Sequence, residues 1–419
     1  MAKIAELKSR QVFDSRGFPT IETDIILSDG SVGSAIVPSG ASTGSYEAHE
    51  LRDKNKKYLN KSVFEAVENV NIKINNSIKN LDAYDQKKID TTLIELDGTK
   101  NKSNIGANSI LSVSIANCKA AAKSKKKEVF EYLSTDNNYK LPYPLMNIIN
   151  GGVHANNSLN IQEFMVRPDG AKSFQECMQF VFLIIQNLKK NLLKKNLSTN
   201  VGDEGGFAPD LNSDEEAIEL LLESIDQSGF TPGKHINICL DVASNELYDG
   251  SKYSIINNKK ITPTELIEYY KNLVNKYPIK SIEDPIFEDD WESWTGLTDL
   301  IGEKIQIVGD DLFVTNYERL SKGIKSASAN SILIKLNQIG TVSETLKTIQ
   351  LAQNNGLSTI ISHRSGDTED TFIADLAIAT KSNQIKTGSL ARSERVAKYN
   401  QLLRIEEELG KKARMNKIH

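Results

Sequence analysis

Ionisable residues stand at the ends of six successive apolar runs in the second half of this sequence. They are three carboxylic acids, two lysines and a histidine–arginine pair: Asp241, Glu283, Asp310, Lys335, Lys386, His363 and Arg364. A single charge beside an apolar strand is usually a solvent-facing side chain or half of an ion pair. A whole series favours another explanation, because burying a charge is costly unless it pairs or binds a metal. The pattern predicts one shared cavity.

The chemistry of this set is limited by the ligands that it offers. Three carboxylates make a hard, all-oxygen site suited to Mg²⁺, and the sequence has no histidine–cysteine cluster of the kind that zinc prefers. Beside a divalent cation the ammonium form of Lys335 would be disfavoured, which makes it a usable base. A metal and a lysine together suit removal of a proton alpha to a carboxylate, because the metal stabilises the enolate.

Two glycine-rich strings offer further chemistry. GDEGGFAP, 202–209, carries Asp203 and Glu204, and a carboxylic acid there could protonate a departing hydroxyl. Taken alone, a tight turn with solvated acids explains this string better. SGASTG, 39–44, has the small residues of a loop that closes over an anionic substrate and excludes water. Taken alone, it is an ordinary loop.

The elements that must position these residues have the pattern of repeated β/α units from residue 141 onward. Apolar runs alternate with amphipathic helical stretches, as in a (β/α)8 barrel, whose strand ends carry the catalytic residues. The predicted strands are 143–149, 164–166, 236–242, 279–282, 305–308, 332–336, 359–361 and 384–386, and the predicted helices include 174–193, 215–225 and 344–353. Two helices precede the third strand, so this barrel would start irregularly.

A smaller α+β unit, residues 1–135, is predicted ahead of the barrel, residues 141–419. Two short runs, 21–27 and 32–37, are typical of strands joined by the Asp29–Gly30 turn. Beyond residue 52 the spacing of apolar residues becomes helical, as at Val63, Val67, Val70 and Ile74.

Composition excludes several classes of protein. The 419 residues suit two domains, and a formal net charge of −4 gives no global attraction to nucleic acid or to an anionic membrane. The sequence has no run of about 20 apolar residues and no apolar signal-peptide core at its start. Three cysteines without CxxC spacing argue against a disulfide framework and fit a reducing compartment. Cys239 lies in an apolar run, which predicts a buried thiol. These features predict a cytoplasmic protein.

Spaced strings across essentially the whole chain resemble those of the enolase family, in the family's order and most closely its bacterial members. They are VPSGASTG (37–44), LMNIINGG (145–152), IQEF (161–164), GDEGGFAP (202–209), SIEDP (281–285), GDDLFVTN (309–316), ILIKLNQIGT (332–341), ISHRSGDTED (361–370) and IKTGS (385–389). NQLLRIEEELG, 400–410, is similar to the family's C-terminal helix.

The resemblance implies an α/β protein, with an N-terminal α+β domain followed by an atypical TIM-like (β/α)8 barrel that begins ββαα. It implies a magnesium-dependent lyase of glycolysis and gluconeogenesis. The reaction would be reversible dehydration of 2-phospho-D-glycerate to phosphoenolpyruvate, with two Mg²⁺ per active site.

The resemblance also implies residue roles. Lys335 would take the C2 proton, and Glu204, supported by Glu163, would act as acid on the C3 hydroxyl. Lys386 would meet the substrate carboxylate, while Arg364 and Ser365 would meet its phosphate. The remaining expected residues are Asp241, Glu283 and Asp310 for the first Mg²⁺, Ser42 for the second, and His154 and His363 in the cavity wall.

The same resemblance implies a homodimer or an octamer of dimers. Departures from the family pattern are Asp367, where glutamate is frequent, and Ser109 and Ser112, where alanine and glycine are usual. None removes a matched catalytic position. A racemase or cycloisomerase of the same superfamily is the enzymatic alternative, against which the two glycine-rich loops and Lys386 argue. A role as a scaffold in an RNA-processing assembly, or on the cell surface, stays open beside catalysis.

Overall fold

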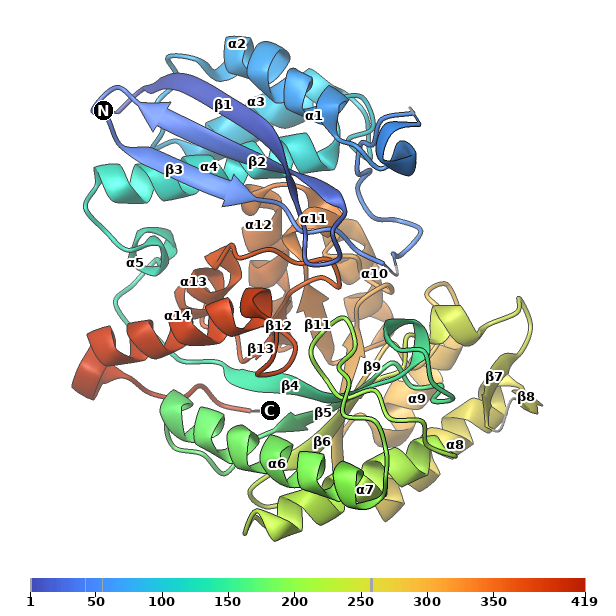
Figure 1. Cartoon of the computed structure of the whole chain (residues 1–419). Helices are drawn as coiled ribbons and strands as arrows, with labels where there is room; N and C mark the ends of the chain where they lie inside the picture. The colour runs from blue at the N-terminus through green and yellow to red at the C-terminus, as the bar shows by residue number, and fades with distance from the viewer. Residues whose placement is uncertain (1, 42, 55, 257–258, 419) are drawn as a thin grey trace.

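An antiparallel sheet with helices on one side forms the N-terminal part of the chain (Figure 1). The computed structural model describes residues 2–41, 43–54, 56–256 and 259–418. The sheet has the order β1 (Ile4–Phe13), β2 (Pro19–Leu27), β3 (Val32–Ile36). Its helices are α1 (Phe64–Glu68), α2 (Asn75–Ile78), α3 (Gln86–Asp97), α4 (Ala107–Ser124) and α5 (Val129–Leu133).

Helix α4 packs closely against β2 and β3 because small residues line the contact. A Cβ added at Gly33 would lie 2.2 Å from the carbonyl oxygen of Ala116, so only glycine fits there. The two serines that depart from the family pattern are buried on α4 and use their hydroxyls. Ser112 Oγ lies 2.7 Å from Thr23 Oγ1, and Ser109 Oγ donates to the Ala66 carbonyl at 3.1 Å.

A closed eight-stranded barrel forms the rest of the molecule. Its strands, in spatial order, are β10 (Gln306–Gly309), β11 (Ser331–Ile334), β12 (Ser358–Ser362), β13 (Gln384–Lys386), β4 (Tyr143–Asn150), β5 (Glu163–Arg167), β6 (Asn237–Asp241) and β9 (Ile279–Glu283). β5 is antiparallel to both neighbours, and the other pairs are parallel. The predicted irregular start, two strands and then two helices, is confirmed.

Several helices of the barrel begin at residues whose side chains cap a free N–H group. The barrel helices are α6 (Phe174–Lys194), α7 (Asp214–Gln227), α8 (Pro263–Lys276), α9 (Trp291–Ile301), α10 (Tyr317–Ser326), α11 (Leu336–Ile339), α12 (Val342–Asn354), α13 (Phe372–Ala379) and α14 (Ser393–Leu409). Ser173, Ser213 and Thr341 each accept a hydrogen bond from the amide three residues on. Thr262 and Glu265 complete a reciprocal capping box on α8.

The structure differs from the sequence prediction in three places. β1 escaped it because lysine, serine, arginine and glutamine interrupt its apolar residues, although it pairs with β2 along its whole length. The hairpin β7 (Tyr253–Ile256) and β8 (Lys259–Ile261) lies outside the barrel. The predicted helix over 63–74 is divided, since α1 passes into a π-helical turn, Asn69–Ile74, before α2.

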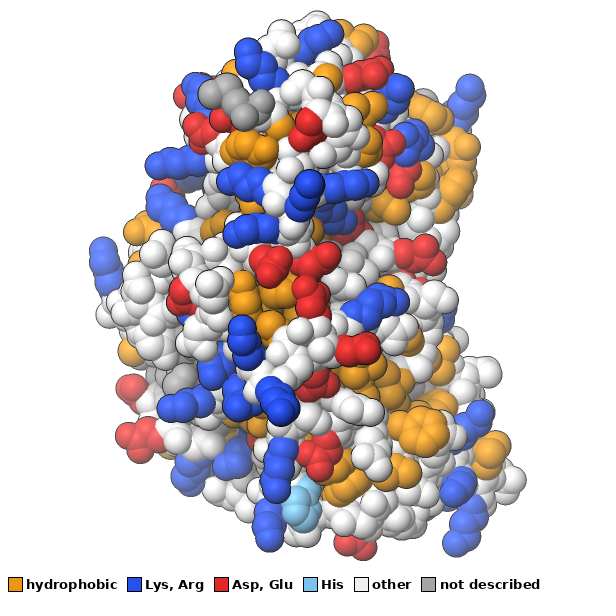
Figure 2. Space-filling view, turned by 90° about the vertical axis from the view of Figure 1, so that its left-hand side faces the viewer, with side chains coloured by type: hydrophobic (Ala, Val, Ile, Leu, Met, Phe, Trp, Pro, Cys, Tyr) orange, Lys and Arg blue, Asp and Glu red, His pale blue; other side chains and the backbone are white. Residues whose placement is uncertain are grey.

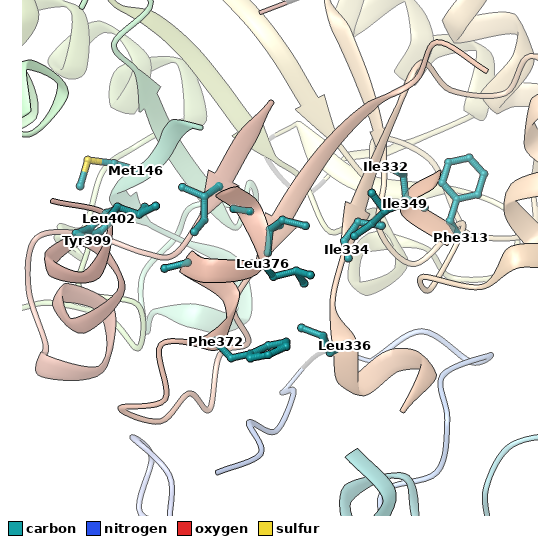
Figure 3. Close-up of a cluster of buried hydrophobic side chains, with 14 of the residues drawn as sticks. Met146, Phe313, Ile332, Ile334, Leu336, Ile349, Phe372, Leu376, Tyr399 and Leu402 are labelled. Atoms are coloured by element: carbon teal, nitrogen blue, oxygen red, sulfur yellow. The ribbon is translucent and has the colours of Figure 1, made fainter. Parts of the chain in front are cut away.

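The main core lies between the barrel strands and their outer helices. Ile332 and Ile334 of β11 pack toward Ile349 of α12, near Phe372 and Leu376 of α13 (Figure 3). A separate, smaller layer fills the barrel interior: Leu145, Met165, Cys239, Val308, Leu333 and Ile360. Cys239 is buried, as predicted, and burial raises the pKa of its thiol to about 12.

The molecular surface carries mixed charge. Figure 2 shows lysine and arginine side chains interspersed with aspartate and glutamate over one face. Within the described ranges, no helix combines the length and the apolar character needed to cross a membrane.

Candidate active site

Strand periodicity explains why the polar residues meet at one end of the barrel. Side chains two apart in a strand share a face. Leu333 of β11 lies in the interior layer, so Lys335, just beyond the strand, points to the barrel mouth. Val308 and Cys239 are interior in the same way, which directs Asp310 and Asp241 to the same opening.

Glu163 reaches this end by a different route. It stands at the start of β5, two residues before the interior Met165. In a uniformly parallel barrel, a strand start lies at the opposite end from the catalytic residues. β5 runs antiparallel, however, and Glu163 is paired with Asp241 at the end of β6. The reversal of one strand thus adds a carboxylate to the mouth.

Lys386 is the centre of the first cluster in the cavity. Its Nζ donates to Asp241 at 2.8 Å and to Glu283 at 2.9 Å, and lies 3.1 Å from Glu163. Burial acts to lower the pKa of Lys386, but these carboxylates outweigh it, so the pKa is raised well above its ordinary value. The acids sit close enough together to surround one cation.

Lys335 pairs with Asp310 in a short contact. Burial acts to lower the pKa of Lys335, but the Asp310 carboxylate outweighs it and the pKa is raised. A divalent cation beside Lys335 would act in the opposite direction. Gln338 Nε2 donates to the second Asp310 oxygen at 2.8 Å, and Thr315 Oγ1 donates to Gln338 Oε1 at 2.7 Å, so Asp310 is held on both sides.

Two carboxylates and two histidines form the second cluster. Glu204 Oε1 lies 3.4 Å from His363 Nε2 and 3.6 Å from His154 Nδ1. Burial and the neighbouring Glu204 charge raise the pKa of Glu163 well above its ordinary value. Burial acts to raise the pKa of Glu204 as well, but its contacts with His363 and His154, together with the nearby Arg395 charge, outweigh burial and the pKa is lowered. The pair therefore holds its first proton on Glu163.

The GDEGG loop fixes Glu204 against the barrel. Gly202 N donates to the Gly206 carbonyl at 2.8 Å, and Gly205 has a φ of +85°, which favours glycine. A Cβ at Gly206 would lie 2.8 Å from Asn150 Oδ1, so the loop needs glycine to come this close. Asn147 Nδ2 then donates to Glu204 Oε2 at 3.4 Å.

The N-terminal loop reaches the mouth beside Arg364 and Ser365. Ala41 N donates to Ser365 Oγ at 2.7 Å, and Ser39 and Gly366 exchange backbone hydrogen bonds. Arg364 is buried and donates to both oxygens of Glu47, at 2.8 Å and 3.0 Å. A Cβ on Gly40 would lie 2.0 Å from the Arg364 guanidinium. Ser42, the expected ligand of a second Mg²⁺, lies outside the described residues.

The acids offer more than one grouping for a metal. Among the described residues, two groups have ligand atoms within 4.8 Å of one another: His154, Glu163 and Glu204, and Asp284, Asp310 and Asp311. Of the three acids predicted to bind the first Mg²⁺, only Asp310 belongs to either group. Asp284 already accepts hydrogen bonds from the amides of Asp310 and Asp311, at 2.9 Å each, and so braces the turn after β10. Over the part of the chain that the structure describes, the hydrogen-bond donors to Asp241, Glu283 and Asp310 are lysines, glutamines and a backbone amide. The hard oxygen chemistry of these three acids fits Mg²⁺.

The cavity is open to solvent, and its free space, counted together with the solvent at its mouth, is about 420 Å³. All predicted site residues line the cavity except Glu283 and the undescribed Ser42. Glu283 lies behind Lys386, which lines the cavity and forms an ion pair with it. The sequence interpretation missed Gln338, Asp311, Glu47 and Arg395. The first two lie within quoted strings, and Glu47 follows SGASTG closely, so proximity to a motif could have found them. Arg395 gave no signal, because an arginine near a helix start is usually solvated.

Comparison with known proteins identifies similar sequences over both parts of the chain. A family model described as the enolase N-terminal domain matches residues 4–133, and one described as the enolase C-terminal TIM barrel domain matches residues 138–419. A curated relative from Pelagibacter ubique (strain HTCC1062), named enolase, is 61% identical over 420 residues, which cover 100% of both chains.

Proposed function

The chain belongs to the enolase family, and on that premise we propose that its cavity carries out the reversible dehydration of 2-phospho-D-glycerate to phosphoenolpyruvate. One observation carries the proposal: a lysine and a proton-holding pair of carboxylates meet in one buried cavity. An elimination of water needs both a base at one carbon and an acid at the next.

Lys335 is the base in this proposal. Its amine removes the proton from C2, and the electron pair left behind moves into the adjacent carboxylate. Lys386 binds that carboxylate in this proposal, which its position in the lining of the cavity supports. Neutral Lys335 is required for this step, so its pairing with Asp310 must weaken when substrate and metal bind.

The Glu163–Glu204 pair supplies the acid. A proton passes from the pair to the C3 hydroxyl, the C3–oxygen bond breaks, and water leaves as the double bond forms. Glu204 delivers the proton in this proposal, and Glu163, whose pKa is raised by burial and by Glu204, holds it between turnovers. In the reverse direction the pair removes a proton from water.

Asp241, Glu283 and Asp310 would hold the first Mg²⁺, and Ser42 would contribute to a second beside the phosphate. When bound, the metal supplies positive charge that stabilises the doubly charged carboxylate formed at C1. Arg364 and Ser365 bind the phosphate, an assignment supported by the buried guanidinium, whose planar fork suits phosphate oxygens. His154 and His363 line the wall on the side of Glu204.

Assembly and location belong to the same proposal. The N-terminal unit, 1–135, caps the barrel, 141–419, and its loop completes the cavity, which the Ala41–Ser365 hydrogen bond supports. The enzyme is a homodimer, or an octamer that is built from dimers. It works in the cytoplasm, which three buried free cysteines support.

The test is a steady-state assay of purified protein with 2-phosphoglycerate, in which the ultraviolet absorbance of phosphoenolpyruvate is followed. A rise that requires Mg²⁺ and that a chelator abolishes is the expected result. Folded protein that gives no rise with Mg²⁺ present would overturn the proposal and favour a different carboxylate substrate.

A further inference from the structure

Arg395 is a fully buried arginine beside the cavity that the proposed reaction does not use. It stands in the first turn of α14 and points at the turn that follows β12. Its Nη1 lies 2.7 Å from His363 Nδ1, and its Nη2 donates to the Ser365 carbonyl at 2.6 Å. Nη1 also donates to the carbonyl of Arg364.

The contact with Arg395 decides which nitrogen of His363 carries a proton. A guanidinium has only donors and stays charged. His363 Nδ1 must therefore offer its lone pair, and the single ring proton of the neutral imidazole must lie on Nε2. That nitrogen faces Glu204 Oε1 at 3.4 Å.

We infer that Arg395 is a positioning residue that holds His363 as a neutral Nε2–H donor directed at Glu204. The inference deepens the proposed function and rests on it for the role of Glu204. Burial lowers the pKa of His363 to about 4, which agrees with a neutral ring.

The fixed tautomer protects the proton of the carboxylate pair. With its proton on Nδ1, His363 would turn an Nε2 lone pair toward Glu204 and accept the proton that the C3 hydroxyl needs. As an Nε2–H donor the ring of His363 cannot accept that proton, which removes one route by which Glu204 could lose it. The same contact at 3.4 Å helps to orient the Glu204 carboxylate, whose other oxygen accepts from Asn147 at 3.4 Å.

The first test measures the tautomer in the unaltered protein. Histidine labelled with ¹⁵N in both ring positions is examined by long-range ¹H–¹⁵N correlation at about pH 7, and the His363 signals are those missing from His363→Gln. We expect a pyridine-like Nδ1 and a pyrrole-like Nε2. A pyrrole-like Nδ1, or an imidazolium pattern, overturns the inference and leaves the proposed reaction untouched.

The second test separates positioning from simple support of the turn. Arg395→Lys keeps the charge but loses the fork, and Arg414→Lys is the matched control, since Arg414 only donates to exposed carbonyls near the C-terminus. We expect Arg395→Lys to lower kcat for dehydration about 10- to 100-fold, with exchange of the C2 proton near the wild-type rate and a new Nδ1–H signal from His363. Equal loss of both steps, or no loss of either, overturns the inference. If the variant fails to fold, the tautomer measurement decides alone.

Discussion

At the scale of the residue, the cavity depends on charges that only their neighbours make tolerable. Lys386 is buried to 3% exposure, and its ammonium is stabilised by Asp241, Glu283 and Glu163. Removing Lys386 would leave these three buried carboxylates without their shared cation, which is strongly destabilising. In the proposed reaction, a metal ion would bind the acids of this cluster and the substrate carboxylate would bind Lys386, so that both replace the ion pairs seen here.

The base and the acid should separate experimentally. Lys335→Ala should abolish exchange of the C2 proton of 2-phosphoglycerate with solvent, because no amine then reaches C2. Glu204→Gln should block loss of water and keep some exchange, because Lys335 is intact. Both are measured by deuterium incorporation and by phosphoenolpyruvate formation in the same sample. Exchange that survives in Lys335→Ala would identify another base.

A matched substitution controls for general damage to the barrel. Lys325→Ala removes an exposed lysine at the end of α10, and both rates should stay at the wild-type level. If Glu204→Gln lost both C2 proton exchange and loss of water while Lys325→Ala kept both, one group would serve as both acid and base.

At the scale of the element, the barrel strands set the direction of each site residue and the outer helices carry buried polar groups of their own. Asp375 on α13 is the clearest example. Its Oδ1 has no hydrogen-bond partner among the described residues, and Gln401 donates to Oδ2 at the long distance of 3.4 Å. Burial raises the pKa of Asp375 to about 7, although Lys119 acts to lower it.

This carboxyl should make stability depend on pH near neutrality. Its folded pKa of about 7 exceeds the unfolded value of about 3.9, so the folded state binds the proton more tightly. The resulting stabilisation is present at low pH and is lost as pH rises through about 7. Asp375→Asn, which stays neutral, should raise the melting temperature relative to wild type at about pH 8 and much less at about pH 5.

Thermal unfolding at the two pH values measures this effect. Asp299→Asn, at an exposed position on α9, is the control and should show no difference between them. An Asp375→Asn shift that is equal at both pH values would mean that the carboxyl does not titrate in this range.

At the scale of the whole molecule, buried polar groups tie the N-terminal unit to the barrel. Asp90 of α3 accepts from Ser343 N at 2.9 Å, in the first turn of α12, and from Ser114 Oγ at 2.7 Å. Lys102 and Glu344 form a second tie at 3.1 Å. Helix α12 follows closely on Lys335, so the N-terminal unit supports the part of the barrel that carries the proposed base.

Loss of the Asp90 contact should loosen this junction. Asp90→Ala leaves a buried amide and a buried hydroxyl without their acceptor, which should lower the free energy of unfolding by about 1–3 kcal/mol. Urea unfolding measures the loss, and limited proteolysis should detect earlier cleavage between α5 and β4. Glu95→Ala, at an exposed position on the same helix, should leave both unchanged. A change in Asp90→Ala no larger than in Glu95→Ala would show that Asp90 does not stabilise the junction.

The sequence by itself determined the strand and helix series of the barrel, because apolar periodicity is a local property. Motif order then identified the family and supplied the set of expected site residues. What only the tertiary structure decided are the relations between distant segments. The reversal of β5 brings Glu163 beside Asp241, Glu47 engages Arg364 across the two units, and Arg395 orients His363. These contacts join residues 78, 317 and 32 positions apart along the chain. Local patterning cannot show such contacts, because they form only when the barrel closes.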